Sequence, residues 1–166
     1  FSINSLFEIH KQISSNNLTD SNPAINLANW ITGIPLIYYP HGLQSAAIRL
    51  KSSFQENSKT HAIAEDIIES CHNGIVAWTN PSIVQPILLK GVDDYIKTKE
   101  RFLIIEQFLK EKNIDFKIIN SVEGNILTKI ISLIYLFDFS SIYHAILSEK
   151  DPSPVLPIDY IKNHVM

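Results

Sequence analysis

Three short strand-like segments that alternate with helical patterns constrain the fold of this chain more than any other feature. They span Ile34–Tyr39, Ile83–Leu89 and Phe116–Val122. Strand, crossover helix, strand is the order that builds a parallel sheet. The chain has 166 residues, which is enough for one domain with a good core and too short for two ordinary domains. The sequence therefore predicts a single α/β domain over residues 1–166, a three-layer αβα sandwich with a mainly parallel sheet.

Apolar periodicity predicts the helices around these strands. Pro86 interrupts the second run and predicts an edge strand or a local bulge, because proline has no N–H for a sheet. In the apolar stretch 125–150, Asp138, Ser140 and Ser141 predict a cap or kink near the middle. Helices are expected at 1–14, from Pro23 to Gly33, from Leu43 past Phe54, at 61–69, 95–112 and 125–150, and after Pro157.

Composition and missing motifs argue against several classes of function. The net charge is −3, so a basic surface for nucleic acid is not expected. The longest apolar run, Ile130–Phe137, is far shorter than the roughly 20 residues that a membrane span needs. The single Cys71 fits a reducing cytoplasm. Because GxGxxG, Walker, CxxC and HExxH motifs are absent, neither a nucleotide cofactor nor a metal is predicted.

The stretch from Phe54 to Trp78 holds a possible base and a possible acid. Glu56 falls on the polar face of a predicted helix, two turns after Arg49, and His72 falls in a turn. His41 follows the first predicted strand, where open α/β sheets bind ligands. Taken singly, each residue also has an ordinary explanation. Glu56 reads as a solvated carboxylate and His72 as a capping or exposed histidine.

Several segments resemble one family in order and spacing, over roughly residues 30–162. The segments are IPLIYY at Ile34–Tyr39, AAIRLKSSFQENSK at Ala46–Lys59, ESCHNGIVAW at Glu69–Trp78, SVEGN at Ser121–Asn125, LIYLFDFSSIYHAIL at Leu133–Leu147 and DPSPVLPIDYIK at Asp151–Lys162. Together they resemble the C-terminal half of the archaeal and bacterial bifunctional phosphoglucose/phosphomannose isomerases. The agreement of several ordered motifs is more specific than any one of them.

The resemblance implies a sugar isomerase (SIS) domain with a doubly wound sheet. In that family two similar SIS halves form the site, which is shared across a dimer and needs no cofactor. This chain would be the C-terminal half, downstream of an N-terminal half with the loop that binds the sugar phosphate. The apolar stretch 125–150 is a candidate dimer interface, because one small domain cannot cover it.

The resemblance also implies residue roles in aldose-ketose isomerisation of glucose 6-phosphate and mannose 6-phosphate. Glu56 matches the catalytic base, His72 the ring-opening histidine and Lys162 a catalytic lysine near the C-terminus. Among the residues expected to bind substrate, Arg49 is a candidate to steady negative charge. Ser153, where the family often has threonine, would shape the pocket, and His41 completes this set.

Three positions depart from the family pattern. Gly74 stands where an acidic residue commonly follows the HN pair, and Gln55 and Ser58 replace the usual asparagine and alanine. These differences leave the proposed acid and base in place. They keep open an alternative, a non-catalytic SIS module that binds a sugar phosphate or mediates dimerisation.

Overall fold

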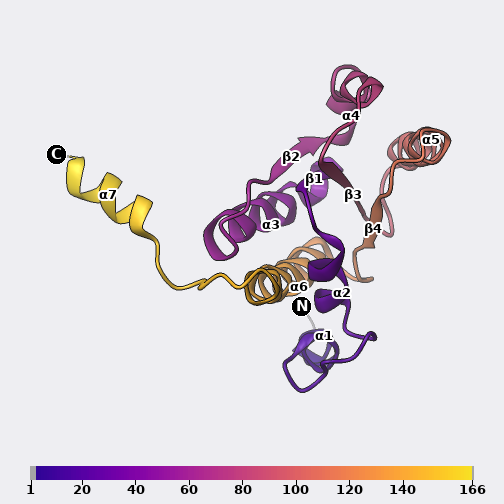
Figure 1. Ribbon diagram of the computed structural model, residues 1–166. Coiled ribbons are helices and arrows are strands. Elements are labelled where there is room, and N and C mark those ends of the chain that lie inside the picture. The colour runs from indigo at the N-terminus through magenta and orange to yellow at the C-terminus, as the bar shows by residue number, and fades with distance from the viewer. Residues whose placement is uncertain (1–2, 166) are drawn as a thin grey trace.

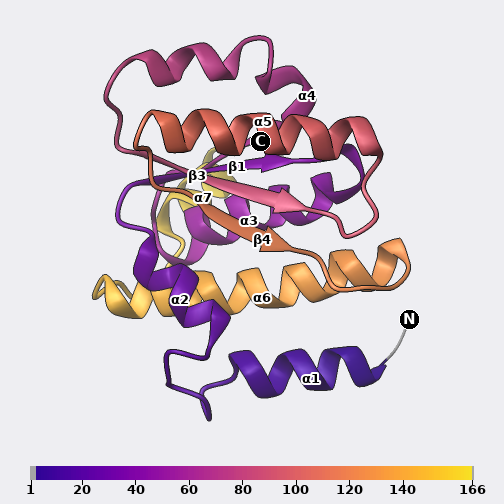
Figure 2. The ribbon, with the colours of Figure 1, turned by 90° about the vertical axis from the view of Figure 1, so that its right-hand side faces the viewer.

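The computed structural model describes residues 3–165, in which a parallel sheet lies between two layers of helices (Figures 1 and 2). The strand order is β2-β1-β3-β4, and every paired neighbour is parallel. The predicted three-layer α/β architecture is confirmed. Residues 1 and 2 of the first predicted helix lie outside the described residues. The strands are β1 (Ile34–Tyr39), β2 (Ile63–Asp66), β3 (Val84–Lys90) and β4 (Lys117–Asn120).

Each face of the sheet has its own hydrophobic core. One core contains Leu50 and Phe54 together with Phe137, and the opposite core contains Trp78 and Phe102. Figure 2 shows α1, α2, α3 and α6 on one side of the sheet and α4 and α5 on the other. The helices are α1 (Ile3–Ile13), α2 (Pro23–Trp30), α3 (Gln44–Asn57), α4 (Ile67–Ser70), α5 (Ile96–Glu111), α6 (Ile126–Leu147) and α7 (Leu156–His164), with short 3-10 helices η1 (His41–Leu43) and η2 (Gly74–Thr79).

Asparagine side chains begin two of these helices. The Asn22 Oδ1 atom accepts hydrogen bonds from the backbone N–H groups of Ala24 (2.9 Å) and Ile25 (3.2 Å), which supports the predicted cap before Pro23. The Asn125 Oδ1 atom accepts from the Thr128 N–H at 2.9 Å and starts α6. These side chains satisfy N–H groups that the first turn of a helix leaves without partners.

The helix predicted at 61–69 is wrong over its first half. Residues 63–66 form β2, which pairs with β1 from Leu36↔Ile63 to Tyr39↔Asp66. Only α4 is helical, and the Asp66 carboxylate caps it by accepting from the Ile68 N–H at 2.8 Å. Pairing with the buried β1 strand therefore overrides the helical periodicity of a short segment.

The predicted edge position of the Pro86 strand is also wrong. Strand β3 lies inside the sheet, between β1 and β4. Pro86 pairs with Leu36 of β1, whereas the first pair between β3 and β4 is Ile87↔Lys117. At the level of Pro86 the strand thus has a paired neighbour on one side only, which is where a residue without an N–H is tolerated.

Helix α6 runs unbroken through the predicted cap or kink. The Ser140 Oγ–H donates to the Leu136 carbonyl and the Ser141 Oγ–H to the Asp138 carbonyl, each at 2.8 Å, so both hydroxyls are satisfied within the helix. Within residues 3–165, α6 is the one helix long and apolar enough to cross a membrane by length and composition. It packs against α1, α2 and α3, with buried residues from Thr128 to Ala145, as a core helix does.

Helix α7 stands apart from the rest of the domain. It extends away from the other helices at the end of a segment without regular structure (Figure 1). None of its residues is buried, although it carries large apolar side chains such as Tyr160 and Ile161. A helix of this length is marginal on its own in water, so its stability depends on packing that this copy of the chain does not supply.

His144 should make the folded state less stable at acid pH. Its side chain is 7 % exposed, its Nε2 atom lies 3.1 Å from the Ile31 carbonyl oxygen, and burial lowers the pKa of the ring despite that hydrogen bond. Below about pH 6.5 the unfolded chain takes up a proton at this histidine before the folded chain does. The free energy of unfolding is therefore higher above about pH 6.5. It falls as the pH drops from there towards the lower pKa that His144 has in the folded chain.

The measurement is urea unfolding between pH 7.5 and 5, with wild type and His144→Gln compared at each pH. Glutamine retains an N–H for the Ile31 carbonyl but does not titrate. We expect the variant to lose less unfolding free energy than wild type over this interval. Parallel pH profiles would contradict the prediction.

Candidate functional site

Glu56 lies on the last turn of α3. Just after this helix comes Lys59, a non-glycine residue whose backbone is in the left-handed region. The Ser58 and Thr60 N–H groups both donate to the Phe54 carbonyl at 3.2 Å, and Lys59 has a φ of 55°. The Lys59 Nζ donates to the Glu56 carbonyl oxygen (2.6 Å) and to the Pro152 carbonyl oxygen (3.2 Å). A non-glycine residue with φ above zero costs about 1 kcal/mol or more. Contacts with the surrounding structure must therefore stabilise this turn.

The Glu56 side chain is exposed and available for chemistry. Among the described residues its carboxylate has no hydrogen-bond or ion-pair partner. A pocket of about 480 Å³ lies between the end of α3 and the segment that leads to α7, and the residue before Glu56, Gln55, lines it whereas Glu56 itself does not. Ser153 is exposed in that segment, where its N–H donates to the Asp151 carboxylate at 2.9 Å. The pocket is lined by Gln55, Lys59, Thr60, His61, Pro154, Leu156 and Pro157.

His72 and His41 lie at the carboxyl ends of the strands, whereas Glu56 lies at their amino ends. Glu56 is in the last turn of α3, and the chain after this helix leads to the first residue of β2. Glu56 therefore lies near the amino ends of the strands. His41 follows the carboxyl end of β1, and His72 follows β2 and α4. Both histidines are exposed, and the His72 N–H donates to the Glu69 carbonyl at 2.9 Å. One copy of the chain therefore does not bring the predicted base and the predicted ring-opening histidine together.

Glu65 occupies the space beside Gly74, one of the positions that departs from the family. A Cβ atom on Gly74 would lie 2.5 Å from a carboxylate oxygen of Glu65. Burial is the main cause that raises the pKa of Glu65, and the charge of Glu69 adds to it. The turn after His72 thus has a carboxylate next to it, supplied by β2.

Lys162 is exposed and lies on α7, the helix that extends away from the rest of the domain (Figure 1). On the helical wheel it shares a polar face with Asp159 and Asn163, opposite the apolar side chains. If α7 packs through its apolar face, this lysine stays at the border of the contact. Lys162 makes no hydrogen bond or ion pair with Glu56 or His72 within the described residues.

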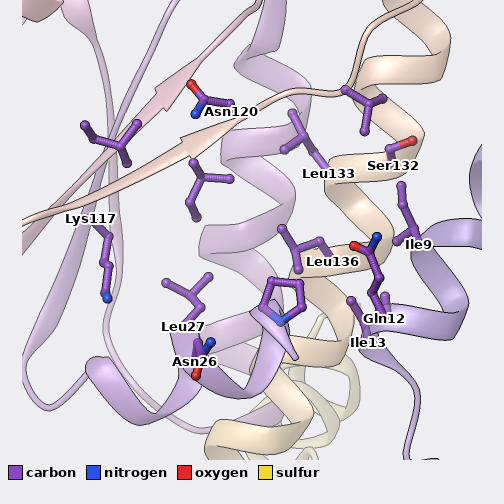
Figure 3. Close-up of a pocket in the computed structure, with 14 residues that line it drawn as sticks. Ile9, Gln12, Ile13, Asn26, Leu27, Lys117, Asn120, Ser132, Leu133 and Leu136 are labelled. Carbon is purple, nitrogen blue, oxygen red and sulfur yellow. The ribbon is translucent and has the colours of Figure 1, made fainter. Parts of the chain in front are cut away.

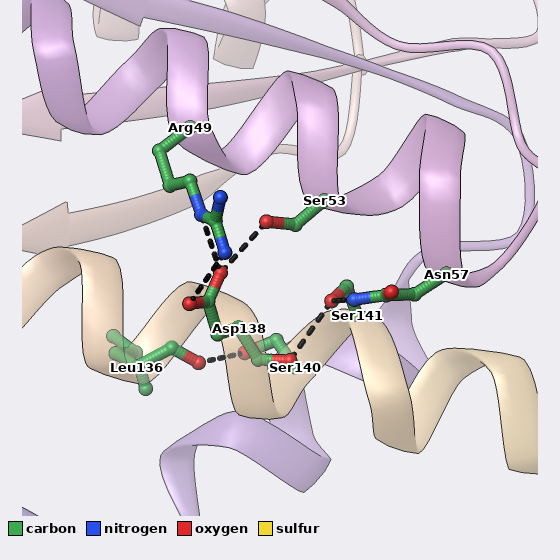
Figure 4. Close-up of polar contacts among 7 residues, drawn as sticks. All are labelled: Arg49, Ser53, Asn57, Leu136, Asp138, Ser140 and Ser141. Atoms are coloured by element: carbon green, nitrogen blue, oxygen red, sulfur yellow. Dashed lines mark hydrogen bonds and ion pairs between the residues drawn. The ribbon is translucent and has the colours of Figure 1, made fainter. Parts of the chain in front are cut away.

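Arg49 is already paired inside the domain. Its Nε and Nη2 atoms donate to the two Asp138 carboxylate oxygens at 2.9 and 3.0 Å, a two-pronged ion pair between α3 and α6 (Figure 4). The hydrogen bond to Asp138 is the main cause that raises the pKa of Arg49, and the charge of Glu56 makes a smaller contribution. The guanidinium that we predicted to steady substrate charge therefore has a carboxylate partner.

An ion pair at the carboxyl ends of the strands was not predicted from the sequence. Strands β1 and β3 are neighbours there, at the point where the strand order reverses and open sheets bind ligands. Lys129 of α6 is 5 % exposed and pairs with the exposed Asp93, which follows β3. The hydrogen bond from Lys129 lowers the pKa of Asp93. A lysine within an otherwise apolar helix is the signal that could have indicated this pair.

A further cavity of about 450 Å³ lies between the sheet edge at β4 and the helices α1, α2 and α6 (Figure 3). None of the predicted site residues lines it. Within residues 3–165, no group of three or more His, Cys, Asp or Glu side chains is placed to hold a metal ion. The cavity is lined by Ile9, Gln12, Ile13, Pro23, Asn26, Leu27, Lys117, Ile118, Ile119, Asn120, Val122, Ser132, Leu133 and Leu136.

Comparison with known sequences gives one consistent answer. Residues 20–165 match the family described as bacterial phospho-glucose isomerase C-terminal SIS domain. The bifunctional phosphoglucose/phosphomannose isomerase of Caldicellulosiruptor bescii is 33 % identical over 135 residues, which is 78 % of this chain and 40 % of that protein. The protein of the same name from Aquifex aeolicus is 31 % identical over 144 residues, 84 % of this chain and 45 % of that protein.

The chain therefore spans less than half the length of these two relatives. Among solved structures, a glucose-6-phosphate isomerase like protein from Thermus thermophilus superposes with a TM-score of 0.73. The alignment covers 90 % of this chain and 51 % of that chain at 17 % sequence identity. At that identity the likeness shows the fold alone.

Proposed function

The chain belongs to the bacterial phospho-glucose isomerase C-terminal SIS domain family, and we propose that it supplies the catalytic base of an aldose-ketose isomerase. The substrates are glucose 6-phosphate and mannose 6-phosphate, and the product is fructose 6-phosphate. The observation that carries the proposal is Glu56, which is exposed, has no partner for its carboxylate among the described residues and lies within the QENSK segment that resembles the family motif.

The chemistry requires one carboxylate that moves a proton. After ring opening, the Glu56 carboxylate removes the proton from C2 of the aldose, which leaves an enediolate, and returns it to C1 to form the ketose. His72 and Lys162 act on the ring oxygens. Ser153 and His41 contact the substrate, and no metal or cofactor takes part. Glucose and mannose derivatives differ at C2, so one base that reaches C2 in either configuration accepts both.

The proposed site is completed by other parts of the assembly. Glu56 and His72 lie at opposite edges of the sheet, which supports a site that combines residues from two copies of the chain. The two curated relatives are more than twice as long as their match to this chain, which supports an N-terminal SIS half carrying the phosphate-binding loop. We assign α6, with exposed Ile142 and Ile146, to the homodimer interface, and assign the protein to the cytoplasm.

The alternative is an SIS module that binds a sugar phosphate or mediates dimerisation without turnover. One observation favours it. Arg49, the cation expected to steady negative charge on a substrate, is paired with Asp138 inside the domain.

The test is to purify the polypeptide as its natural gene encodes it and to measure fructose 6-phosphate formed from glucose 6-phosphate and from mannose 6-phosphate. Enzymatic turnover on both substrates, with a dimer by light scattering, is the expected result. Thermal stabilisation by either sugar phosphate without turnover would favour the alternative. Neither turnover nor stabilisation would overturn both.

A further inference from the structure

A stripe of polar residues crosses the contact between α3 and α6. Arg49, Ser53 and Asn57 are spaced by four residues, so they lie along one line of α3, and all three bond to α6. The rest of the contact is apolar, with Leu50 and Phe54 in the same core cluster as residues of α6. This line ends one residue after Glu56, the base of the proposed function.

Asp138 is the centre of the stripe. Its carboxylate accepts both bonds from Arg49, at 2.9 and 3.0 Å, and a third from the Ser53 Oγ–H at 2.7 Å (Figure 4). The side chains of Arg49 and Asp138 are 51 % and 29 % exposed, so the ion pair lies at the border of the contact. A two-pronged pair of this kind adds directional specificity beyond its modest net energy.

Ser141 continues the stripe to the end of α3. The Asn57 Nδ2–H donates to the Ser141 Oγ at 2.8 Å, and that hydroxyl donates to the Asp138 carbonyl. Ser141 is fully buried, so its hydroxyl depends on these partners. Ser140, also fully buried, bonds only to the Leu136 carbonyl of its own helix. Of the two neighbouring serines, only Ser141 has a bond across to α3.

We infer that Ser141 and Asp138 are positioning residues for Glu56, an inference that rests on the proposed function. Apolar contacts are non-directional and tolerate small rotations of one helix on another, whereas hydrogen bonds require a definite distance and angle. The bond to Asn57 acts on the last turn of α3, where helices fray. Together with the Lys59 contact to the Glu56 carbonyl, it holds the backbone from which the Glu56 side chain extends.

The experiment compares Ser141→Ala with Ser140→Ala in the polypeptide as its natural gene encodes it. Each variant removes one buried hydroxyl that bonds to its own helix, and Ser141→Ala also removes the acceptor of the Asn57 bond, so it should lose more unfolding free energy than Ser140→Ala. Because a displacement near 1 Å costs up to 10²-fold in rate, Ser141→Ala should lower kcat by about 10- to 100-fold. KM should stay within about twofold of wild type, and Ser140→Ala should keep wild-type kcat.

Asn57→Ala gives an independent check on the same bond. If both residues act through it, the double variant Asn57→Ala, Ser141→Ala should have about the kcat of either single variant, because the second change removes nothing further. Multiplying effects in the double variant would overturn the inference. Equal kcat in Ser141→Ala and Ser140→Ala would also overturn it.

Amide hydrogen exchange separates this inference from the proposed function. The Ser58 and Thr60 amides, which bond to the Phe54 carbonyl, should exchange at least about threefold faster in Ser141→Ala than in Ser140→Ala. This measurement needs no turnover. An inactive wild type with faster exchange in Ser141→Ala would refute the isomerase and keep the helix-positioning role, whereas unchanged exchange would refute that role.

Discussion

Glu56→Gln in the polypeptide as its natural gene encodes it is expected to lower kcat for glucose 6-phosphate by about 10²- to 10⁴-fold, the usual contribution of a general base. Glutamine has the size of glutamate but cannot take a proton from C2 and return it to C1. Glu56 is exposed, and its carboxylate has no partner among the described residues, so the change should leave the fold intact. The measurement is the steady-state rate of fructose 6-phosphate formation, with KM close to wild type.

Glu100→Gln is the matched control. Glu100 is an exposed carboxylate that pairs with Lys97 at 2.8 Å, and its helix α5 lies on the other side of the sheet from α3, which carries Glu56 (Figure 2). Loss of this ion pair should change the free energy of unfolding by less than about 1 kcal/mol and leave kcat unchanged. If Glu56→Gln retained kcat within about threefold of wild type, Glu56 would not be the base, since removing a general base costs far more.

Gly33→Ala is expected to destabilise the fold by about 3 kcal/mol, at the upper end of the cost of overpacking. A Cβ atom at this position would lie 2.0 Å from the Ile83 carbonyl oxygen. That oxygen is backbone and accepts the Ile34 N–H at 3.0 Å where β1 meets β3, so it cannot move without disturbing the strand pairing. The Gly33 N–H also donates to the Gln85 side chain at 2.6 Å. The measurement is the midpoint of urea unfolding.

Gly42→Ala controls for the loss of a glycine. Its added Cβ would have the Ile126 Cδ1 atom at 3.7 Å as its nearest neighbour, which is ordinary van der Waals contact. A change within about 0.5 kcal/mol is expected there, as for most substitutions without a clash. Equal unfolding midpoints for Gly33→Ala and Gly42→Ala would show that the close approach at Gly33 is unimportant.

Elements with a continuous apolar pattern were predictable from the sequence. β1 was predicted over its observed range, Ile34–Tyr39, and the strands β3 and β4 within a few residues of theirs. The misassigned segment 61–69 is short, and its helical periodicity could not reveal that residues 63–66 pair with β1. The edge predicted for Pro86 failed for a related reason. Sheet order depends on contacts between distant segments, and a proline signals only a missing N–H.

Candidate site residues were predicted by type and motif, and their arrangement was not. The QENSK segment indicated Glu56, yet nothing local showed that α3 would take it to the amino edge while β2 takes His72 to the carboxyl edge. Arg49 resembled a free cation in the sequence, because Asp138, its partner, lies 89 positions away. The pairing of Lys129 with Asp93 was hidden in the same way.

The sequence by itself determined the α/β class, most of the elements, the family and the residue types available for proton transfer. These follow from periodicity, from turn and cap residues and from ordered motifs, which are local properties of the chain. Only the tertiary structure decided which charges face each other and which edge of the sheet each candidate reaches. Contacts between residues far apart in sequence set the strand order, the helix packing and ion pairs such as Arg49 with Asp138. These interactions contribute free energy only when folding brings the residues together.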